Sequence, residues 1–392
     1  MNIPSIAHAT ITNKTVLLRA DFNVSLAGNK IIDDTRITQV LPTIQHLLKH
    51  HNKLIIISHL GRPKGRDAKY SLLPVERRLQ KYIPDFHIHL IHDFLSPEGQ
   101  DACKKQTDKD ILLLENIRFY TGEEKNDPNF AQSLAKLGDV YVNDGFGVSH
   151  RSDASVVGIP KLLPHFAGLL MEKEIKAISA IFQNPKHPII AIIGGAKTET
   201  KIPLLYKLTE LADTLALGGA IATTFLASQG FEIGKSLIDK GLEKEVQKII
   251  THAKTHHTSI LLPQDVRSAP SSESTSFSIF PVNHIPKDES IFDIGPETEA
   301  AFGNAITKAQ TIVWNGPVGF IENPIFAQGT DFLYYSIADN TDAYSVVGGG
   351  DTLAALSQEE HVGKISHIST GGGAMLEFIE KGTLPGIEAL KA

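Results

Sequence analysis

The sequence predicts an α/β fold of two lobes, each a parallel sheet covered by helices, with a helix joining the lobes. Short, apolar, β-branched segments alternate with helical patterns along the whole chain, which is typical of parallel sheets covered on both faces. Near the middle, one helical pattern over Leu169–Phe182 ends at Asn184-Pro185 and separates two such series. At 392 residues, the chain is long enough for two or three domains.

Each expected strand is a short, mostly apolar run bounded by polar or turn-forming residues. In the first half we expect strands at Val16–Ala20, Leu54–Ser58, His87–Ile91, Ile111–Glu115 and Val140–Asn143, and helices at Thr38–His51, Pro74–Tyr82 and Pro128–Leu137. In the second half we expect strands at Ile189–Ile193, Thr214–Leu217, Ile260–Leu262, Ile291–Ile294, Ile312–Trp314, Tyr344–Val347 and Ile365–Ser369, with helices after most of them.

Composition narrows the classes of function. The 42% apolar and 21% charged residues are ordinary for a globular protein, and the net charge of −6 gives no electrostatic footprint for nucleic acid. The single Cys103 fits a reducing compartment, and the N-terminus lacks a secretory pattern. No apolar stretch approaches the roughly 20 residues of a membrane helix. We therefore expect a cytoplasmic protein that binds neither nucleic acid nor membranes.

Four strand-to-helix junctions in the second half contain consecutive glycines, and none of this form occurs in the first half. They are Gly194-Gly195, Gly218-Gly219, Gly348-Gly349-Gly350 and Gly371-Gly372-Gly373. Adjacent glycines let the backbone approach a ligand, and the free N–H groups at a helix start favour an anion. One such junction could be a tight turn, but four together predict a nucleotide cleft at the carboxyl ends of a parallel sheet.

Basic and polar side chains follow the expected strands of the first half. Because the carboxyl ends of parallel strands share one edge, we expect these groups to converge there. Guanidinium groups in excess over carboxylates favour a small ligand with several negative charges. The alternative is that the arginines are solvated or paired with Asp21, Glu115 and Asp144.

Two loops of the second half carry residues suited to a polyphosphate. Lys197 and Lys201 lie one helical turn apart after a glycine pair and could reach a phosphoryl group. Thr352 adds a hydroxyl to the triple-glycine loop, and Asp351 could hold a magnesium ion on a polyphosphate. An exposed helix face explains the lysines equally well, and a helix cap explains Asp351.

Other protein classes share a two-lobed α/β architecture. Glu322, in the loop after Ile312–Trp314, could accept hydrogen bonds from a ribose, or the loop could be a plain β-turn. A nicotinamide dehydrogenase is one alternative, but no G-x-G-x-x-G follows an expected strand. A hinged solute-binding protein is another, although it would normally carry a secretory pattern.

Taken together, these residues resemble the phosphoglycerate kinase family. The resemblance runs from Arg19 to Leu390 in ten ordered segments: Arg19–Val24, Ser58–Pro63, Glu115–Phe119, Tyr141–Arg151, Leu170–Glu174, Gly194–Lys197, Asp293–Thr298, Trp314–Glu322, Gly348–Thr352 and Ser369–Glu377. It implies two Rossmann-like lobes, a phosphoglycerate lobe at 1–168 to which 378–392 return, and a nucleotide lobe at 184–377. The helix 169–183 between them would act as a hinge that closes the cleft.

The resemblance further implies an activity and its ligands. The activity is reversible phosphoryl transfer between 1,3-bisphosphoglycerate and ADP, giving 3-phosphoglycerate and ATP, with magnesium on the nucleotide. We expect a monomer. The attacking group of phosphoglycerate is an ionised carboxylate, so no general base is needed, and catalysis depends on alignment and on cations around the migrating group.

Residue roles follow from the same resemblance. The phosphoglycerate ligands would be Asp21, Phe22, Asn23, Arg36, His59, Arg62, Arg118 and Arg151. The nucleotide ligands would be Lys197, Lys201, Gly295, Glu322, Gly349, Gly350, Asp351 and Thr352, with Asp351 also at the magnesium ion. Arg36 and Lys197 would stabilise the group in transfer.

Some positions depart from the family pattern. Ser25 stands in place of proline, Gly145 in place of alanine, and Val148-Ser149 in place of Thr-Ala. Thr198-Glu199-Thr200 replaces Val-Ser-Asp, and Ala220-Ile221 replaces Gly-Met. None of these changes removes a charged group with an implied role. We therefore expect activity, and the loop after Lys197 is where hinge or nucleotide contacts could differ.

Overall fold

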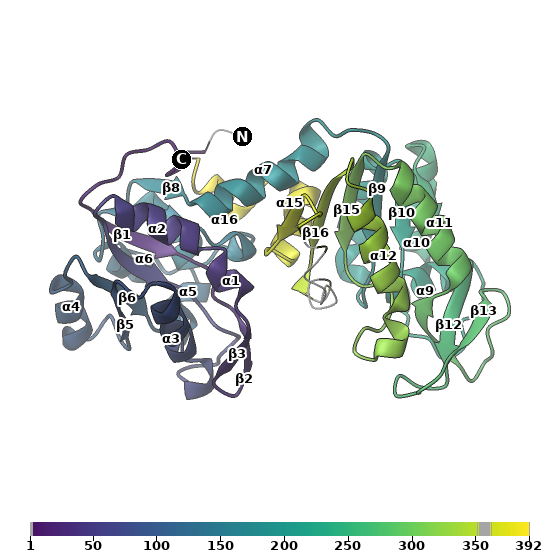
Figure 1. Cartoon of the computed structure of the whole chain (residues 1–392), viewed down its shortest axis with the longest axis horizontal. Coiled ribbons are helices and arrows are strands. Elements are labelled where there is room, and N and C mark those ends of the chain that lie inside the picture. Colours follow the sequence, from purple (N-terminus) through teal and green to yellow (C-terminus); the bar gives the residue numbers. More distant parts are fainter. Residues whose placement is uncertain (1–2, 351, 353–360, 362, 392) are drawn as a thin grey trace. The chain divides into compact units, whose positions relative to one another are not determined.

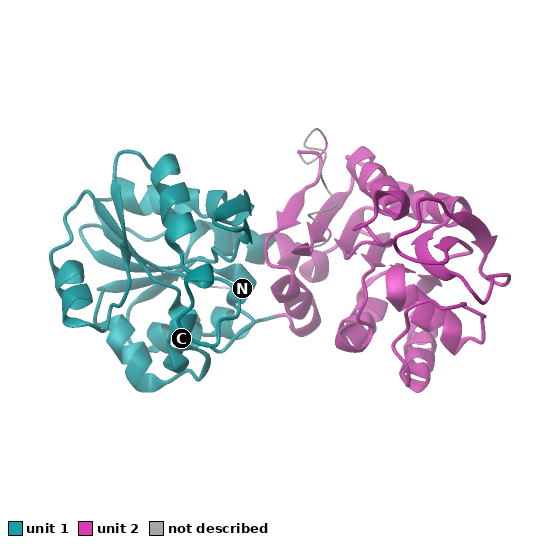
Figure 2. Ribbon diagram, turned by 90° about the horizontal axis from the view of Figure 1, so that it is seen from below, with its two compact units in different colours: residues 1–176, 383–392 teal, residues 177–382 magenta. Residues whose placement is uncertain are grey.

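The structure, a computed structural model, describes residues 3–350, 352, 361 and 363–391. The chain forms two compact units (Figure 2). Unit 1 is Met1–Lys176 with Thr383–Ala392, and unit 2 is Ala177–Gly382. The division falls inside the longest described helix, α7 (Leu169–Gln183), and the end of the chain belongs to unit 1.

Unit 1 is built on a six-stranded parallel sheet in the order β5-β6-β4-β1-β7-β8. The strands are β1 (Thr15–Arg19), β4 (Lys53–Ile57), β5 (His87–Ile91), β6 (Asp110–Leu114), β7 (Val140–Asn143) and β8 (His165–Ala167). The chain runs outward from β1 through β4 and later returns to the other side of β1 with β7. Ligands of open parallel sheets bind outside the carboxyl ends of the strands at such a switch point.

Helices cover the sheet of unit 1 (Figure 1). They are α1 (Thr35–Thr38), α2 (Leu41–Lys49), α3 (Leu73–Tyr82), α4 (Pro97–Lys104), α5 (Thr121–Glu124), α6 (Pro128–Ala135) and α16 (Pro385–Glu388). Ile44 of α2 and Leu79 of α3 share a buried cluster with Val16 and Leu54 of the sheet, so these two helices cover one face. Each fully buried aliphatic side chain contributes about 1.5–3 kcal/mol to the core.

Unit 2 repeats this plan with a six-stranded parallel sheet in the order β11-β10-β9-β15-β16-β17. The strands are β9 (Ile189–Ile193), β10 (Thr214–Leu217), β11 (Ser259–Leu261), β15 (Thr311–Asn315), β16 (Tyr344–Gly348) and β17 (His367–Ser369). The strand order reverses between β9 and β15, which places the switch point of this unit at the loops that follow them.

The helices of unit 2 are α8 (Ile202–Leu211), α9 (Gly219–Ser228), α10 (Glu243–Thr255), α11 (Pro296–Lys308), α12 (Gln328–Asp339) and α15 (Gly373–Lys381). Phe302 of α11 and Ile337 of α12 are buried in one cluster with Ile192 and Trp314, so these helices cover one face of the sheet. The predicted fold class, two parallel sheets covered by helices, is confirmed.

Two smaller sheets accompany the parallel ones. A hairpin joins β2 (Ser25–Ala27) to β3 (Lys30–Asp33), and β12 (Asp265–Ala269), β13 (Ser278–Pro281) and β14 (Ser290–Ile294) form an antiparallel sheet. The expected strand Ile291–Ile294 therefore lies outside the parallel sheet. We did not expect β12, because its sequence is polar. Its burial depends on Arg267, whose Nη1 donates to Glu299 Oε1 over 2.6 Å.

Two expected elements differ in extent. The helix expected at Thr38–His51 is interrupted before α2, where Pro42 takes one of the first helical positions. Proline lacks an N–H and fits the first turn of a helix better than its interior. The strand expected at Ile365–Ser369 is limited to β17. None of the helices in the described part of the chain combines the length and apolar character needed to cross a bilayer.

Candidate functional site

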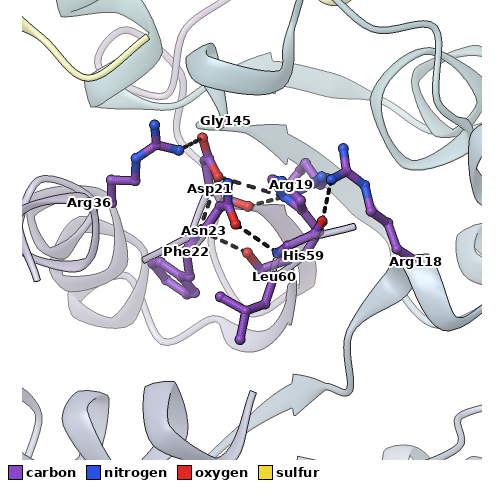
Figure 3. Close-up of polar contacts among 12 residues, drawn as sticks. Arg19, Asp21, Phe22, Asn23, Arg36, His59, Leu60, Arg118 and Gly145 are labelled. Atoms are coloured by element: carbon purple, nitrogen blue, oxygen red, sulfur yellow. Dashed lines mark hydrogen bonds and ion pairs between the residues drawn. The ribbon is translucent and has the colours of Figure 1, made fainter. Parts of the chain in front are cut away.

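In unit 1, the loops after β1 and β4 are held together by side-chain-to-backbone hydrogen bonds (Figure 3). The Phe22 N–H donates to Ser58 Oγ, and the Gly61 N–H donates to Asn23 Oδ1, both over 2.8 Å. Phe22 is fully buried in the hydrophobic core of unit 1, so its ring anchors the loop that follows β1. These contacts fix the backbone at the carboxyl edge of the sheet, where the polar side chains were expected.

Asp21 lies among the basic side chains of this edge (Figure 3). Its Oδ2 accepts from Arg36 Nη1 over 2.6 Å, and its Oδ1 lies 3.7 Å from His59 Nδ1. Burial alone would raise the pKa of Asp21, but the charges of Arg36 and Arg19 bring it below its usual value. Burial lowers the pKa of His59 well below its usual value, although Asp21 opposes this. At neutral pH the carboxylate is therefore charged and the imidazole neutral.

Two buried arginines present N–H groups that have no hydrogen-bond acceptor in the described chain. Arg118 Nη1 donates to the Gly61 carbonyl over 2.7 Å, whereas its Nε and Nη2 have no hydrogen-bond acceptor among the described residues, although Nε lies 3.7 Å from Glu124 Oε1 in a longer ion pair. Arg19 is fully buried, and its Nε donates to Ser155 Oγ over 2.8 Å while its Nη2 has no acceptor. An unsatisfied buried donor costs about 1–3 kcal/mol, so an anion that reached these groups would recover that energy.

Arg62 and Arg151 add cations to this unit with more access to solvent. The Arg62 side chain is exposed, and Arg151 is half-buried. Burial lowers the pKa of Arg118, and the charge of Arg151 lowers it further, while Asp153 and Glu124 oppose the change.

Asp21, Glu115 and Asp144 were the three carboxylates considered as partners for the arginines. Asp21 forms such an ion pair, with Arg36. Glu115 and Asp144 accept hydrogen bonds from other groups. Glu115 accepts from the Leu72 N–H over 2.8 Å and from the Ser71 hydroxyl over 2.7 Å. Asp144 accepts from the Met171 N–H over 3.0 Å at the start of α7. Two of the three carboxylates are therefore not available to neutralise the arginines, as an anion-binding site at this edge would require.

In unit 2, three loops at the carboxyl ends of β9, β10 and β15 pack backbone against backbone. Gly195, Gly219 and Gly316 have φ of +100°, +58° and +88°. A Cβ atom on Gly219 would lie 2.9 Å from Gly195 N, and one on Gly316 would lie 2.4 Å from Gly194 O. Both the dihedral angles and the approach exclude a side chain. The paired glycines thus bring backbone groups from three strands together at the switch point.

The two lysines after β9 have different surroundings. The Lys201 ammonium donates to the Gly194 carbonyl and so supports the glycine turn, whereas Lys197 is exposed. Between them, Thr198 is fully buried and its N–H donates to Asp239 Oδ2 over 2.5 Å. The loop that departs from the family pattern is therefore fixed by contacts inside unit 2.

The triple-glycine loop after β16 is joined to the loop after β15. Gly349 has a φ of +114°, and Thr352 Oγ1 accepts from the Gly316 N–H over 2.7 Å. Asn315 Nδ2 donates to the Gly348 carbonyl over 2.7 Å. The Thr352 hydroxyl thus connects two glycine loops, and Gly350 is exposed. Asp351, the residue expected at the magnesium ion, lies outside the described residues.

The last two predicted nucleotide ligands lie after β14 and β15. Gly295 precedes α11, and a Cβ atom there would lie 2.3 Å from the Asp265 carboxyl carbon. Asp265 caps α11 by accepting from the Thr298 N–H over 2.8 Å. Glu322 is exposed. Within the described ranges, no three His, Cys, Asp or Glu side chains gather as a metal site.

Several residues that hold these loops in place through hydrogen bonds were not predicted from the sequence. Arg19 was predicted only as the end of a strand and not as a site residue. An arginine at the end of an otherwise apolar strand is unusual and could have marked it as a candidate. Ser155, Asp239 and Asp265 gave no such signal. Their contacts reach residues 136, 41 and 33 positions away along the chain, and no local pattern marks contacts of that separation.

Comparison with known proteins decides between the classes that share this architecture. The family model of phosphoglycerate kinase matches residues 6–382. The chain belongs to the phosphoglycerate kinase family. The phosphoglycerate kinase of Moorella thermoacetica is 44% identical over 382 residues, and that of Thermus thermophilus 42% over 383. These alignments cover 97% of this chain and 97% of the first relative, and 96% and 97% for the second.

Solved structures of phosphoglycerate kinases match the fold of this chain over nearly its whole length. The enzyme from Coxiella burnetii superimposes with a TM-score of 0.87 at 38% identity, covering 100% of this chain and 99% of that one. The enzyme from Pyrococcus horikoshii gives 0.88 at 32% identity, covering 99% and 98%. The resemblance stated from the sequence is thereby confirmed. The protein is a glycolytic kinase that transfers a phosphoryl group between phosphoglycerate and adenine nucleotide, and the dehydrogenase and solute-binding alternatives are set aside.

Proposed function

We propose that unit 1 binds 3-phosphoglycerate or 1,3-bisphosphoglycerate through the basic edge of its sheet. The main support is the pair of buried arginines, Arg19 and Arg118, each of which has N–H groups without a hydrogen-bond acceptor in the described chain, while Glu115 and Asp144 are engaged elsewhere. Arg36, Arg62 and Arg151 supply further cations. Asn23 and neutral His59 offer hydrogen bonds, Asp21 orients Arg36, and Phe22 shapes the loop.

We further propose that unit 2 binds ATP or ADP at its glycine loops. Closely packed turns with positive φ bring the backbone of several strands together at the carboxyl edge of the sheet, and glycine turns before helices are common binding sites for phosphates. Gly349, Gly350 and Thr352 would contact the phosphates together with Lys197 and Lys201. Gly295 and Glu322 would lie on the nucleoside side.

A magnesium ion bound with the nucleotide fits this unit. Magnesium on a polyphosphate keeps most of its ligands from phosphate and water, so one protein carboxylate is enough, and we propose Asp351 for it. The ion would neutralise phosphate charge during transfer. The described residues contain no cluster that would serve as a separate metal centre.

For the chemical step, we propose that Arg36 and Lys197 both act on the phosphoryl group in transfer. The Arg36 side chain is 30% exposed while one of its nitrogens is held by Asp21, so it is oriented yet accessible. Lys197 is exposed at its glycine loop. The nucleophilic carboxylate needs no base, which agrees with a neutral His59. Closure of the cleft during the cycle would exclude water from the acyl phosphate.

The cellular setting is also a proposal. We expect the enzyme to act in the cytoplasm, because that is where a glycolytic kinase meets its substrates and where a chain with the single Cys103 stays reduced. We expect a monomer, because each proposed ligand group comes from one copy of the chain.

Calorimetric titration of both ligands tests the assignment of unit 1. Arg118→Gln should weaken 3-phosphoglycerate binding at least about tenfold, since hydrogen bonds to charged groups contribute roughly 1.5–3 kcal/mol, and should leave ADP binding unchanged. Arg77→Gln, an exposed arginine of α3, is the matched control and should change neither. Unchanged 3-phosphoglycerate affinity in Arg118→Gln would refute the assignment.

A further inference from the structure

A buried carboxylate lies beside the arginines of unit 1 without pairing with them. Asp153 is 5% exposed, and its Oδ2 has no hydrogen-bond partner in the described chain. Its backbone carbonyl accepts from the N–H groups of Val156 and Val157, both over 2.9 Å, and so starts the short turn Ala154–Gly158. The backbone of Asp153 thus has a clear structural task, but its carboxylate does not.

Asp153 lies two residues after Arg151 and two residues before Ser155, whose Oγ accepts from Arg19 Nε over 2.8 Å. Burial raises the pKa of Asp153, and the charges of Arg19, Arg118 and Arg151 oppose that rise. Two acidic neighbours, Glu124 and Glu123, also interact with it electrostatically. The three arginines include the two whose N–H groups lack acceptors. Buried donors and a buried acceptor therefore share one region without meeting each other.

We propose that Asp153 is a buried counter-ion of Arg19, Arg118 and Arg151, and that its charge limits how tightly this cluster binds a phosphate-bearing ligand. The inference rests on the proposed assignment of the cluster to phosphoglycerate. A carboxylate that formed close ion pairs would occupy the guanidinium donors. One that stays apart lowers the net charge and leaves those donors to the ligand.

This arrangement suits a reversible kinase. Without Asp153, the three guanidinium groups would repel one another more strongly, because Glu124, which lies 3.7 Å from Arg118 Nε, is largely exposed and its charge is screened by solvent. The cluster would then hold a phosphate so firmly that release became slow. A fixed negative charge near them weakens the bound state by repulsion. Asp153 is thus a residue that sets affinity and positions arginines, and it is not a catalytic residue.

The test is Asp153→Asn, which keeps the size of the side chain and removes its charge. In calorimetric titrations, the Kd for 3-phosphoglycerate should fall about three- to tenfold, the effect expected of one charge several ångströms away at intermediate dielectric. Inorganic sulfate, a competing dianion, should gain affinity by a similar factor. ADP binding should not change. Asp108→Asn, whose side chain is 92% exposed in the same unit, is the matched control and should alter none of these.

Unchanged or weaker 3-phosphoglycerate binding in folded Asp153→Asn would overturn the proposal, because the carboxylate would then be structural or supportive. Asp153→Ser removes the same charge and serves if the asparagine variant does not fold. Arg118→Gln distinguishes failure of the counter-ion proposal from failure of the assignment of the arginine cluster to phosphoglycerate. If it weakens 3-phosphoglycerate binding while Asp153→Asn has no effect, the counter-ion proposal alone fails. If neither variant changes the affinity, the assignment of the arginine cluster fails as well.

Discussion

The anion-binding groups that we propose for unit 1 and unit 2 lie at the carboxyl ends of the same kind of parallel sheet, but they come from different parts of the chain: side chains in one unit and backbone in the other. In unit 1 the groups are side chains, with Arg19 and Arg118 buried at the carboxyl edge. In unit 2 they are backbone groups, brought together by turns at Gly195, Gly219 and Gly316. Guanidinium groups suit a small, highly charged ligand, whereas amide-lined turns suit the phosphate chain of a nucleotide.

The side-chain site of unit 1 and the backbone site of unit 2 have different structural requirements. Buried cations need counter-ions and hydrogen bonds, which Asp21 and Ser155 provide, and they are sensitive to any change of charge. Tight backbone turns need positive φ and close approach, which glycine permits, and they are sensitive to one added methyl group. The first unit should therefore respond to charge and pH, and the second to volume.

The largest expected effect is on turnover, from loss of Arg36. Arg36→Ala should lower kcat roughly a hundred- to a thousandfold, about 3–4 kcal/mol, because it removes a charge aimed at the group in transfer. ADP affinity should stay nearly unchanged, since the residue belongs to unit 1. A coupled assay of ATP-dependent 3-phosphoglycerate phosphorylation measures this. Arg77→Ala is the control, and turnover at the wild-type level in Arg36→Ala would remove this residue from the mechanism.

The second effect is on stability and concerns the buried Glu123 behind Arg19. Burial raises its pKa from 4.5 to about 7, although the charge of Arg19 opposes the rise. Between about pH 5 and 7 the folded chain retains a proton that the unfolded chain loses, so stability falls as pH rises through this window. The linked loss is roughly 3 kcal/mol.

Urea unfolding at pH 5 and pH 8 measures that loss. Glu123→Gln should abolish this part of the pH dependence and be the more stable protein at pH 8. Glu124→Gln, whose side chain is 63% exposed, should behave like the wild type. A pH dependence that survives in full in Glu123→Gln would show that another group is responsible.

The smallest effect compares two glycines of unit 2 that both have positive φ. A Cβ atom on Gly219 would lie 2.9 Å from Gly195 N, whereas a Cβ atom on Gly230, whose φ is +89°, would lie in open space. Alanine should cost each site about 1–2 kcal/mol for the dihedral angle. Gly219→Ala should cost about 1–3 kcal/mol more for crowding and should weaken ADP binding. Equal unfolding energies and equal ADP affinities in the two variants would contradict the account of backbone packing.

Local patterns in the sequence were sufficient for the fold class and for most strands of the parallel sheets. Apolar runs such as Ile189–Ile193 and paired glycines after them are visible without a structure. The antiparallel strand β12 was not, because its burial depends on Arg267 meeting Glu299 32 residues away. Likewise the arginines could be named from sequence, but Asp21 could be separated from Asp144 as their partner only by geometry.

The central claim is that the charged side chains of unit 1 bind phosphoglycerate and the glycine turns of unit 2 bind nucleotide. Nuclear magnetic resonance titration of the intact chain tests it most directly. 3-Phosphoglycerate should shift the amide signals of Asn23 and Gly61 and leave those of Gly195 and Gly219 in place, and ADP should do the reverse. Shifts by 3-phosphoglycerate at Gly195 and Gly219, with none at Asn23 and Gly61, would contradict the claim.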